Sequence, residues 1–122
     1  IGITTPLICY FFVSFVKSRL GYDDSLDAFG CHGMGGVWGA LMTGIFCTKT
    51  INNAGADGLL YGNPGQLIPQ MTGIVTGIIV AVVMTTLIIK VLGIFMKVRA
   101  TASEEAQGLD LIDHGERAYN KL

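Results

Sequence analysis

The feature that most constrains the fold is an apolar stretch from Asp27 to Cys47, with the sequence DAFGCHGMGGVWGALMTGIFC. Between its two ends, His32 is the single ionisable side chain apart from a cysteine thiol. A helix of about 21 residues rises roughly 30 Å, which matches the hydrocarbon core of a bilayer. The stretch therefore predicts a membrane-spanning helix, and a histidine inside such a helix indicates a functional position.

Small residues gather on the His32 side of this helix when each residue turns by about 100°. The residues within about 60° of His32 are Ala28, Phe29, Gly35, Gly36, Gly39, Thr43 and Phe46. The bulky residues of the opposite side are Met34, Val37, Trp38, Leu41 and Ile45. A face of small residues lets a second helix approach closely or leaves a gap, so His32 is expected to point into the protein or a cavity. We predict close helix packing at Gly35, Gly36 and Gly39, and the periodicity alone leaves a packing seam and a pore both open.

Composition also favours a membrane protein. Of the 122 residues, 51% are hydrophobic and 14% are charged, whereas a soluble domain has about 25% charged residues. The net charge of −1 gives no electrostatic reason to expect nucleic acid as a partner. Ile1 opens the chain without a methionine or a basic segment before the apolar run, so we expect no signal peptide and interpret the chain as the C-terminal piece of a larger protein.

The expected fold is all-α, with a transmembrane region over 1–98 and a tail over 99–122. Hydrophobic runs predict three spans, at about 1–18, 27–47 and 67–97, and turn-forming residues predict an external loop over 48–66. Asp23, Asp24 and Ser25 precede the second span, where capping and the helix dipole favour them. Seven of the eight basic residues fall on the side of the first turn and the tail, so the positive-inside rule places the tail in the cytoplasm and Ile1 outside.

The chemistry of His32 has three interpretations. A neutral imidazole has one donor and one acceptor, and it can relay a proton or orient a small polar molecule in a pore. It can equally be a core histidine bonded to a backbone carbonyl. Metal binding with Cys31 is disfavoured because adjacent helical residues point about 100° apart, so we expect no metal and no cofactor. Ser14 and Ser25 have no base placed beside them, and we expect no enzyme activity.

The tail carries a different kind of signal. Thr101-Ala-Ser-Glu104 has the spacing of a capping box. Leu109, Leu111, Ile112 and Tyr119 give the segment apolar groups for docking, although a solvated tail is the alternative on composition alone.

The stretch DDSLDAFGCHGMGGVWGALMTGIF over residues 23–46 resembles the ammonium transporter family (Amt/Mep/Rh), in its Amt branch. A second likeness, GLDL from Gly108 and HGERAYN from His114, is similar to the cytoplasmic tail of that family. The resemblance covers essentially the whole chain. It implies the last three of eleven transmembrane helices followed by the tail.

The resemblance also implies roles for individual residues. His32 corresponds to the second member of a twin-histidine pair in a narrow pore, and Ala28 to a pore-lining position. Asp27 corresponds to an acid with a structural or capping role at the cytoplasmic start of the helix. The tail positions with an implied regulatory role are Gly108, Asp110, His114, Gly115, Glu116 and Tyr119.

The implied function is transport of ammonium, with methylammonium as an analogue, across the plasma (inner) membrane. Ammonium would lose its proton and pass as ammonia beside the pore histidines. The implied partners are membrane lipid, two further copies in a homotrimer, and a PII-type signalling protein on the cytoplasmic side. Ile112 stands where plant relatives carry a phosphorylatable threonine, so that switch is expected to be missing. The alternatives are an ammonium sensor of the same fold and a non-transporting partial remnant.

Overall fold

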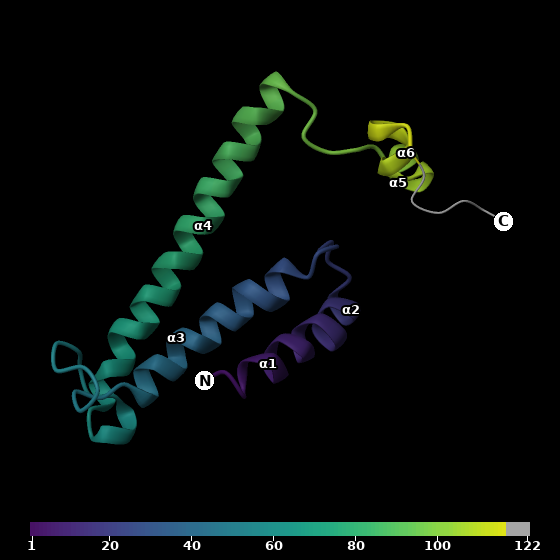
Figure 1. Cartoon of the computed structure of the whole chain (residues 1–122). Helices are drawn as coiled ribbons and strands as arrows, with labels where there is room; N and C mark the ends of the chain where they lie inside the picture. The colour runs from purple at the N-terminus through teal and green to yellow at the C-terminus, as the bar shows by residue number, and fades with distance from the viewer. Residues whose placement is uncertain (117–122) are drawn as a thin grey trace. The chain divides into compact units, whose positions relative to one another are not determined.

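All regular secondary structure in the described part of the chain is helical, as expected (Figure 1). The structure is a computed structural model, and it describes residues 1–116. Contacts divide the chain into two compact units, Ile1–Ile79 and Val80–Leu122.

The first helical segment contains a widened turn. It runs through α1 (Thr5–Phe11), a π-helical turn (Phe12–Val16) and α2 (Lys17–Leu20). Pro6 lies in the first turn, where the missing N–H costs no helical hydrogen bond. In the π turn the Lys17 N–H donates to the carbonyl of Phe12, five residues back instead of four. Gly21 ends the segment in the left-handed conformation, with φ of 64°.

The second helical segment has the same construction. A π-helical turn (Phe29–Gly33) leads into α3 (Met34–Phe46). The Asp24 carboxylate accepts hydrogen bonds from the N–H groups of Ala28 at 2.9 Å and Phe29 at 3.0 Å. The expected capping by an acid in this turn is therefore confirmed for Asp24, because it satisfies two N–H groups that the helix itself leaves free.

The third helix is the longest. α4 (Leu67–Phe95) has 29 residues. Together with the short 3₁₀ turn before it, it forms the one stretch in residues 1–116 that is long and apolar enough to cross a membrane by length and composition, Pro64–Phe95. The first two predicted spans are helical over 5–20 and 28–46, and the crossing of a membrane by all three stays a prediction.

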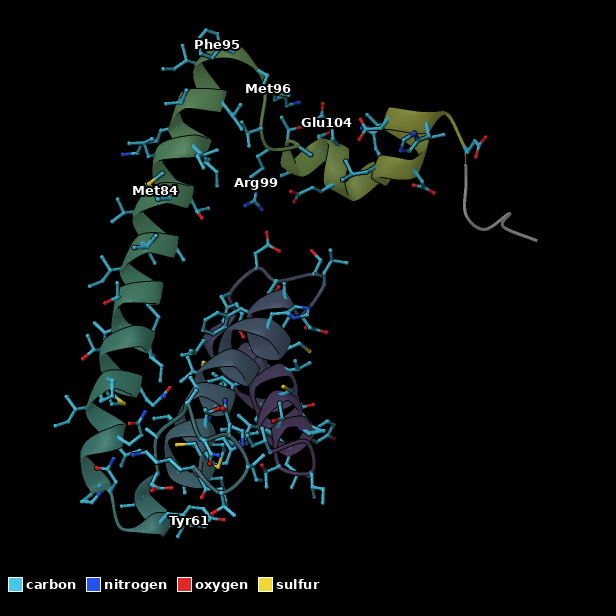
Figure 2. All side chains as sticks on the ribbon, turned by 60° about the vertical axis from the view of Figure 1, so that its left-hand side comes forward. Tyr61, Met84, Phe95, Met96, Arg99 and Glu104 are labelled. Carbon is cyan, nitrogen blue, oxygen red and sulfur yellow. The ribbon has the colours of Figure 1, made fainter. Side chains whose placement is uncertain are left out.

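Apolar side chains surround α4 and stay uncovered within the described residues (Figure 2). Met84 and Phe95 are examples, with exposed fractions of 49% and 80%. No hydrophobic side chain in residues 1–116 is fully buried. Patches of this extent are unusual on a water-soluble surface, and they indicate contact with lipid or with further helices.

The loop over 48–66 is closed by one aspartate. The Asp57 carboxylate accepts hydrogen bonds from the Lys49 N–H at 2.8 Å and the Thr48 hydroxyl at 3.2 Å. The Gly58 N–H donates to the Cys47 carbonyl at 2.8 Å. These bonds bring the end of the loop back to the C-terminal end of α3, just before two 3₁₀ turns, Leu59–Tyr61 and Pro64–Gln66.

The second unit holds the end of α4 and two short tail helices. These are α5 (Ala102–Gln107) and α6 (Leu109–His114), and Gly108 separates them with φ of 94°. Gly115 ends α6 with φ of 68°. Both glycines occupy backbone conformations that side-chain-bearing residues rarely adopt.

Substitution of Gly58 by alanine is expected to destabilise the loop. The added methyl group would lie 2.6 Å from the carbonyl oxygen of Gly44 and 2.8 Å from that of Ile45, and these backbone atoms cannot rotate away. Overpacking of this kind costs about 1–3 kcal/mol. The melting temperature of the whole protein in detergent should fall in the variant. Gly2→Ala, whose methyl group meets no described atom within 4 Å, is the control, and equal melting temperatures for the two variants would contradict the prediction.

Candidate functional site

His32 lies inside the π turn Phe29–Gly33, on the exposed side of the second helical segment. Its imidazole makes no hydrogen bond with any other residue in the described range 1–116. The described residues therefore supply no carbonyl partner of the kind that a core histidine would need. Both ring nitrogens stay open to a proton, a small polar molecule or a group elsewhere in the protein.

The side of the second segment that packs on the first is centred on Gly30 and Gly35. Both glycines are buried. Nearby, the Cys9 thiol donates to the Cys31 carbonyl at 3.5 Å, and the Trp38 indole N–H donates to the Thr4 hydroxyl at 2.9 Å. His32 therefore faces away from the surface that holds the two helical segments together.

The predicted His32 face needs one correction. Its members Ala28, Phe29, Gly36, Thr43 and Phe46 are exposed or half-exposed, and His32 itself is exposed. Gly35 differs, because it is buried against the first segment. The physical reason is the π turn, whose hydrogen bonds span five residues, so a constant step of 100° does not hold across residues 29–33.

The close helix packing expected at Gly35, Gly36 and Gly39 stays a prediction, and within the described residues Gly35 alone of the three has a near neighbour. A methyl group on Gly35 would lie 3.1 Å from the Cys9 sulfur, a close contact, whereas one on Gly36 or Gly39 would meet no described atom within 4 Å. Within the second helical segment, the closest approaches occur instead at Gly30, beside Val13, and at Gly44. Gly44 follows Ala40 by four residues, a spacing typical of close helix packing, whereas no such spacing marks Gly30.

Gly36 lines an apolar groove between α3 and the first half of α4. The groove has a volume of about 270 Å³. Its lining residues are Gly33, Gly36, Val37, Ala40, Gly73, Ile74, Gly77 and Ile78. None of them is ionisable, and His32 is not among them. The small residues on α3 and α4 thus border an open groove within the described residues.

Asp27 has a structural position, although its side chain does not cap the helix. Its carboxylate forms an ion pair with the Lys17 ammonium at 2.6 Å, and the same ammonium donates to the Asp24 carbonyl. Asp27 has φ of 55°, the one positive value outside glycine in the described chain. Aspartate tolerates this conformation better than most residues. The ion pair joins the end of the first segment to the start of the second, and the capping bonds come from Asp24.

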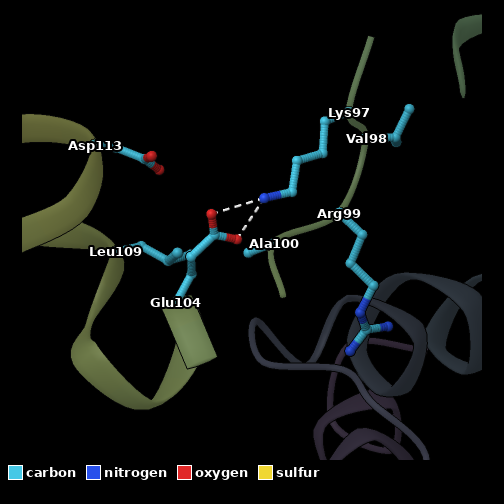
Figure 3. Close-up of a pocket in the computed structure, with 7 residues that line it drawn as sticks. All are labelled: Lys97, Val98, Arg99, Ala100, Glu104, Leu109 and Asp113. Carbon is cyan, nitrogen blue, oxygen red and sulfur yellow. Dashed lines mark hydrogen bonds and ion pairs between the residues drawn. The ribbon is translucent and has the colours of Figure 1, made fainter. Parts of the chain in front are cut away.

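The tail contains a second charged cluster, shown in Figure 3. The Lys97 ammonium bonds both carboxylate oxygens of Glu104, at 2.6 and 2.7 Å. The N–H and hydroxyl of Thr101 donate to the same carboxylate, and the Glu104 N–H donates back to the Thr101 hydroxyl. The predicted capping box is therefore confirmed. The ion pair with Lys97, followed by the Thr101 donors, lowers the pKa of Glu104 from 4.5 to about 2.

The remaining tail positions lie around α6. Gly108 and Gly115 bound the helix with positive φ, and the Glu116 N–H donates to the Asp110 carbonyl at 3.2 Å. His114 is exposed in the last turn. Tyr119 lies outside the described residues. Within residues 1–116 no group of three or more histidine, cysteine or acidic side chains has the geometry to hold a metal ion.

The sequence profile of the Ammonium Transporter Family matches residues 1–119. The chain is 46% identical over 119 residues to an ammonium transporter of Bacillus subtilis and 42% identical over 120 residues to one of Aquifex aeolicus. It is 36% identical over 120 residues to the ammonium transporter Amt1 of Archaeoglobus fulgidus. Each match covers 98% of this chain and 28–30% of the relative, so the chain spans under a third of the length of these proteins.

Removal of the Lys97 charge should raise the pKa of Glu104. Since the pKa in the folded tail is below 4.5, the carboxylate stabilises α5 fully above about pH 4.5 and loses this effect as the pH falls toward 2. In Lys97→Gln, the pKa of the Glu104 carboxyl group should move from about 2 toward 4.5. Carbon-detected NMR titration of the Glu104 carboxyl group measures it. Glu105→Gln is the control because it leaves the Glu104 bonds in place, and an unchanged midpoint in Lys97→Gln would contradict the assignment of the ion pair as the main cause.

Proposed function

Because the chain belongs to the Ammonium Transporter Family, we propose that it forms part of a protein that moves ammonium across a membrane. The family match extends over almost the whole chain, and relatives from bacteria and an archaeon are named as ammonium transporters. Transport, not covalent chemistry, is therefore the activity proposed. The observation that carries it within the chain is the exposed imidazole of His32, unpaired among residues 1–116, on an otherwise apolar helix.

The proposed mechanism follows from the cost of desolvating a cation. An ammonium ion that enters an apolar passage loses strong hydrogen bonds to water, and the charged form is disfavoured there. Removal of its proton leaves ammonia, which crosses the same passage at a much lower cost. An imidazole can accept a hydrogen bond from the substrate at one nitrogen and donate from the other, so His32 suits the position where ammonia passes. Ala28 is proposed to line the same exposed side, and a second histidine is proposed in another part of the protein.

The proposed membrane arrangement has three spans, at about 1–18, 27–47 and 67–97. Helices over 5–20, 28–46 and 67–95 support these bounds. Basic side chains at the first turn and in the tail support a cytoplasmic location for both, in the plasma (inner) membrane. A homotrimer and a PII-type partner on the cytoplasmic side remain part of this proposal through the family resemblance.

The tail is proposed to regulate transport. Its support is the ordered pair of helices α5 and α6, each bounded by a dedicated cap, within a segment that composition would also allow to be solvated. The residues proposed for this role are Gly108, Asp110, His114, Gly115, Glu116 and Tyr119.

Replacement of His32 by alanine is expected to lower ammonium conduction or selectivity in the whole protein that carries this chain. The substitution removes the one side chain on the apolar second helix that can exchange hydrogen bonds with the substrate through two ring nitrogens. Uptake of methylammonium by a transport-deficient cell measures the effect. Cys31→Ala, at the adjacent exposed position, is the control and should transport normally. Uptake in His32→Ala equal to that of the control would count against the pore role.

Deletion of residues 108–122 is expected to change the rate of methylammonium uptake or its response to nitrogen supply. The truncation removes α6 and the residues after it, and it leaves the capping box of α5 in place. Uptake is compared at equal amounts of protein in the membrane, with and without ammonium in the growth medium. A truncated protein with the same rate and the same response as the wild type would remove the tail from the regulatory scheme.

A further inference from the structure

We propose that Gly30 and Val13 are positioning residues for His32, because their contact holds the two π turns of the chain against each other and one of these turns carries the histidine. The inference rests on the proposed function of His32. It explains what fixes the position of the His32 imidazole on an otherwise apolar helix.

The two π turns lie opposite each other on neighbouring helical segments. One spans Phe12–Val16 and the other Phe29–Gly33, and residues of the two turns are in contact. The Lys17 N–H reaches back to Phe12 and the Met34 N–H to Phe29, so each turn contains one residue more than an α-helical turn. Wide turns of this kind are rare, and they are frequent at functional sites. Here each π turn packs against the other.

Gly30 is the closest point of this contact. A methyl group at Gly30 would lie 2.6 Å from the Val13 Cγ2 atom and 3.4 Å from the Val13 backbone nitrogen. The first distance is well inside van der Waals contact, so any side chain at Gly30 must push the turns apart or displace Val13. Gly30 is also buried, which agrees with its role at the interface.

His32 follows Gly30 by two residues within the same π turn. Its side chain has no hydrogen bond of its own among residues 1–116 to hold it. The position of the imidazole therefore depends on the backbone of the turn, and the backbone depends on the contact with Val13. Movement of a functional group by about 1 Å can lower a rate by up to roughly a hundredfold. Loss of the contact between Gly30 and Val13 is therefore expected to lower the maximal transport rate more than it changes the apparent KM.

Gly30→Ala tests this arrangement in the whole protein, with methylammonium as the substrate. The maximal uptake rate per molecule in the membrane should fall by about tenfold or more, with little change in the apparent KM. The double variant Val13→Ala/Gly30→Ala removes the Cγ2 atom that the new methyl group would meet, so it should recover most of the rate. Gly93→Ala is the control, since it adds the same methyl group to a helical position, in α4, where no described atom lies within 4 Å.

Three results would overturn the proposal. They are a normal rate in Gly30→Ala, an equal loss in Gly93→Ala, and a double variant that reaches the membrane at wild-type levels but stays impaired. If Gly30→Ala does not accumulate in the membrane, the double variant is the test. Recovery of both accumulation and rate in it would show that the collision with Val13 caused the loss. His32→Ala is measured alongside. Normal uptake in that variant would reject the proposed role of His32, whereas impaired uptake there with normal uptake in Gly30→Ala would reject only the positioning role.

Discussion

The contact between the two π turns is one of the interactions that hold the first two helical segments together. It brings the two segments together at Gly30 and Val13, and it leaves no space for a side chain on the glycine. Two further bonds, from Cys9 to the Cys31 carbonyl and from Trp38 to Thr4, lie along the same interface. Because the two segments meet on this side, the opposite side of the second segment, with His32, stays uncovered in the described chain.

Two ion pairs lie at the ends of the helices, where they join one element to the next. Lys17 joins Asp27 across the turn between the first two segments, and Lys97 joins Glu104 between the end of α4 and α5. Both pairs also involve backbone groups, the Asp24 carbonyl in one and the Thr101 N–H in the other. Ion pairs that keep contact with solvent contribute little to stability, so we interpret these partly exposed pairs chiefly as contacts that set where one element ends and the next begins.

Much of the fold could be predicted from the sequence because its signals are local. Hydrophobic runs predict spans at about 1–18, 27–47 and 67–97, and the structure has helices over 5–20, 28–46 and 67–95, whose crossing of a membrane stays a prediction. Asp24 and the Thr101–Glu104 capping box were identifiable because a cap acts within a few residues of the chain. Close helix packing at Gly36 and Gly39 stays a prediction, because no described atom lies within 4 Å of a methyl group added at either position. The positions of small residues on a helix indicate where another helix can approach closely, but they do not identify that helix.

The amino-acid sequence alone indicates that the chain is helical, that its helices are apolar on nearly all sides, and that the second helix contains one histidine. Those properties follow from composition and from hydrogen bonds between near neighbours. The tertiary structure decided which side of the second helix is covered. It did so through the π turns, whose five-residue hydrogen bonds shift every later residue around the helix axis. The second of these turns packs against the first where Gly30 meets Val13, and a contact between residues of two different helices leaves no periodic trace in the sequence.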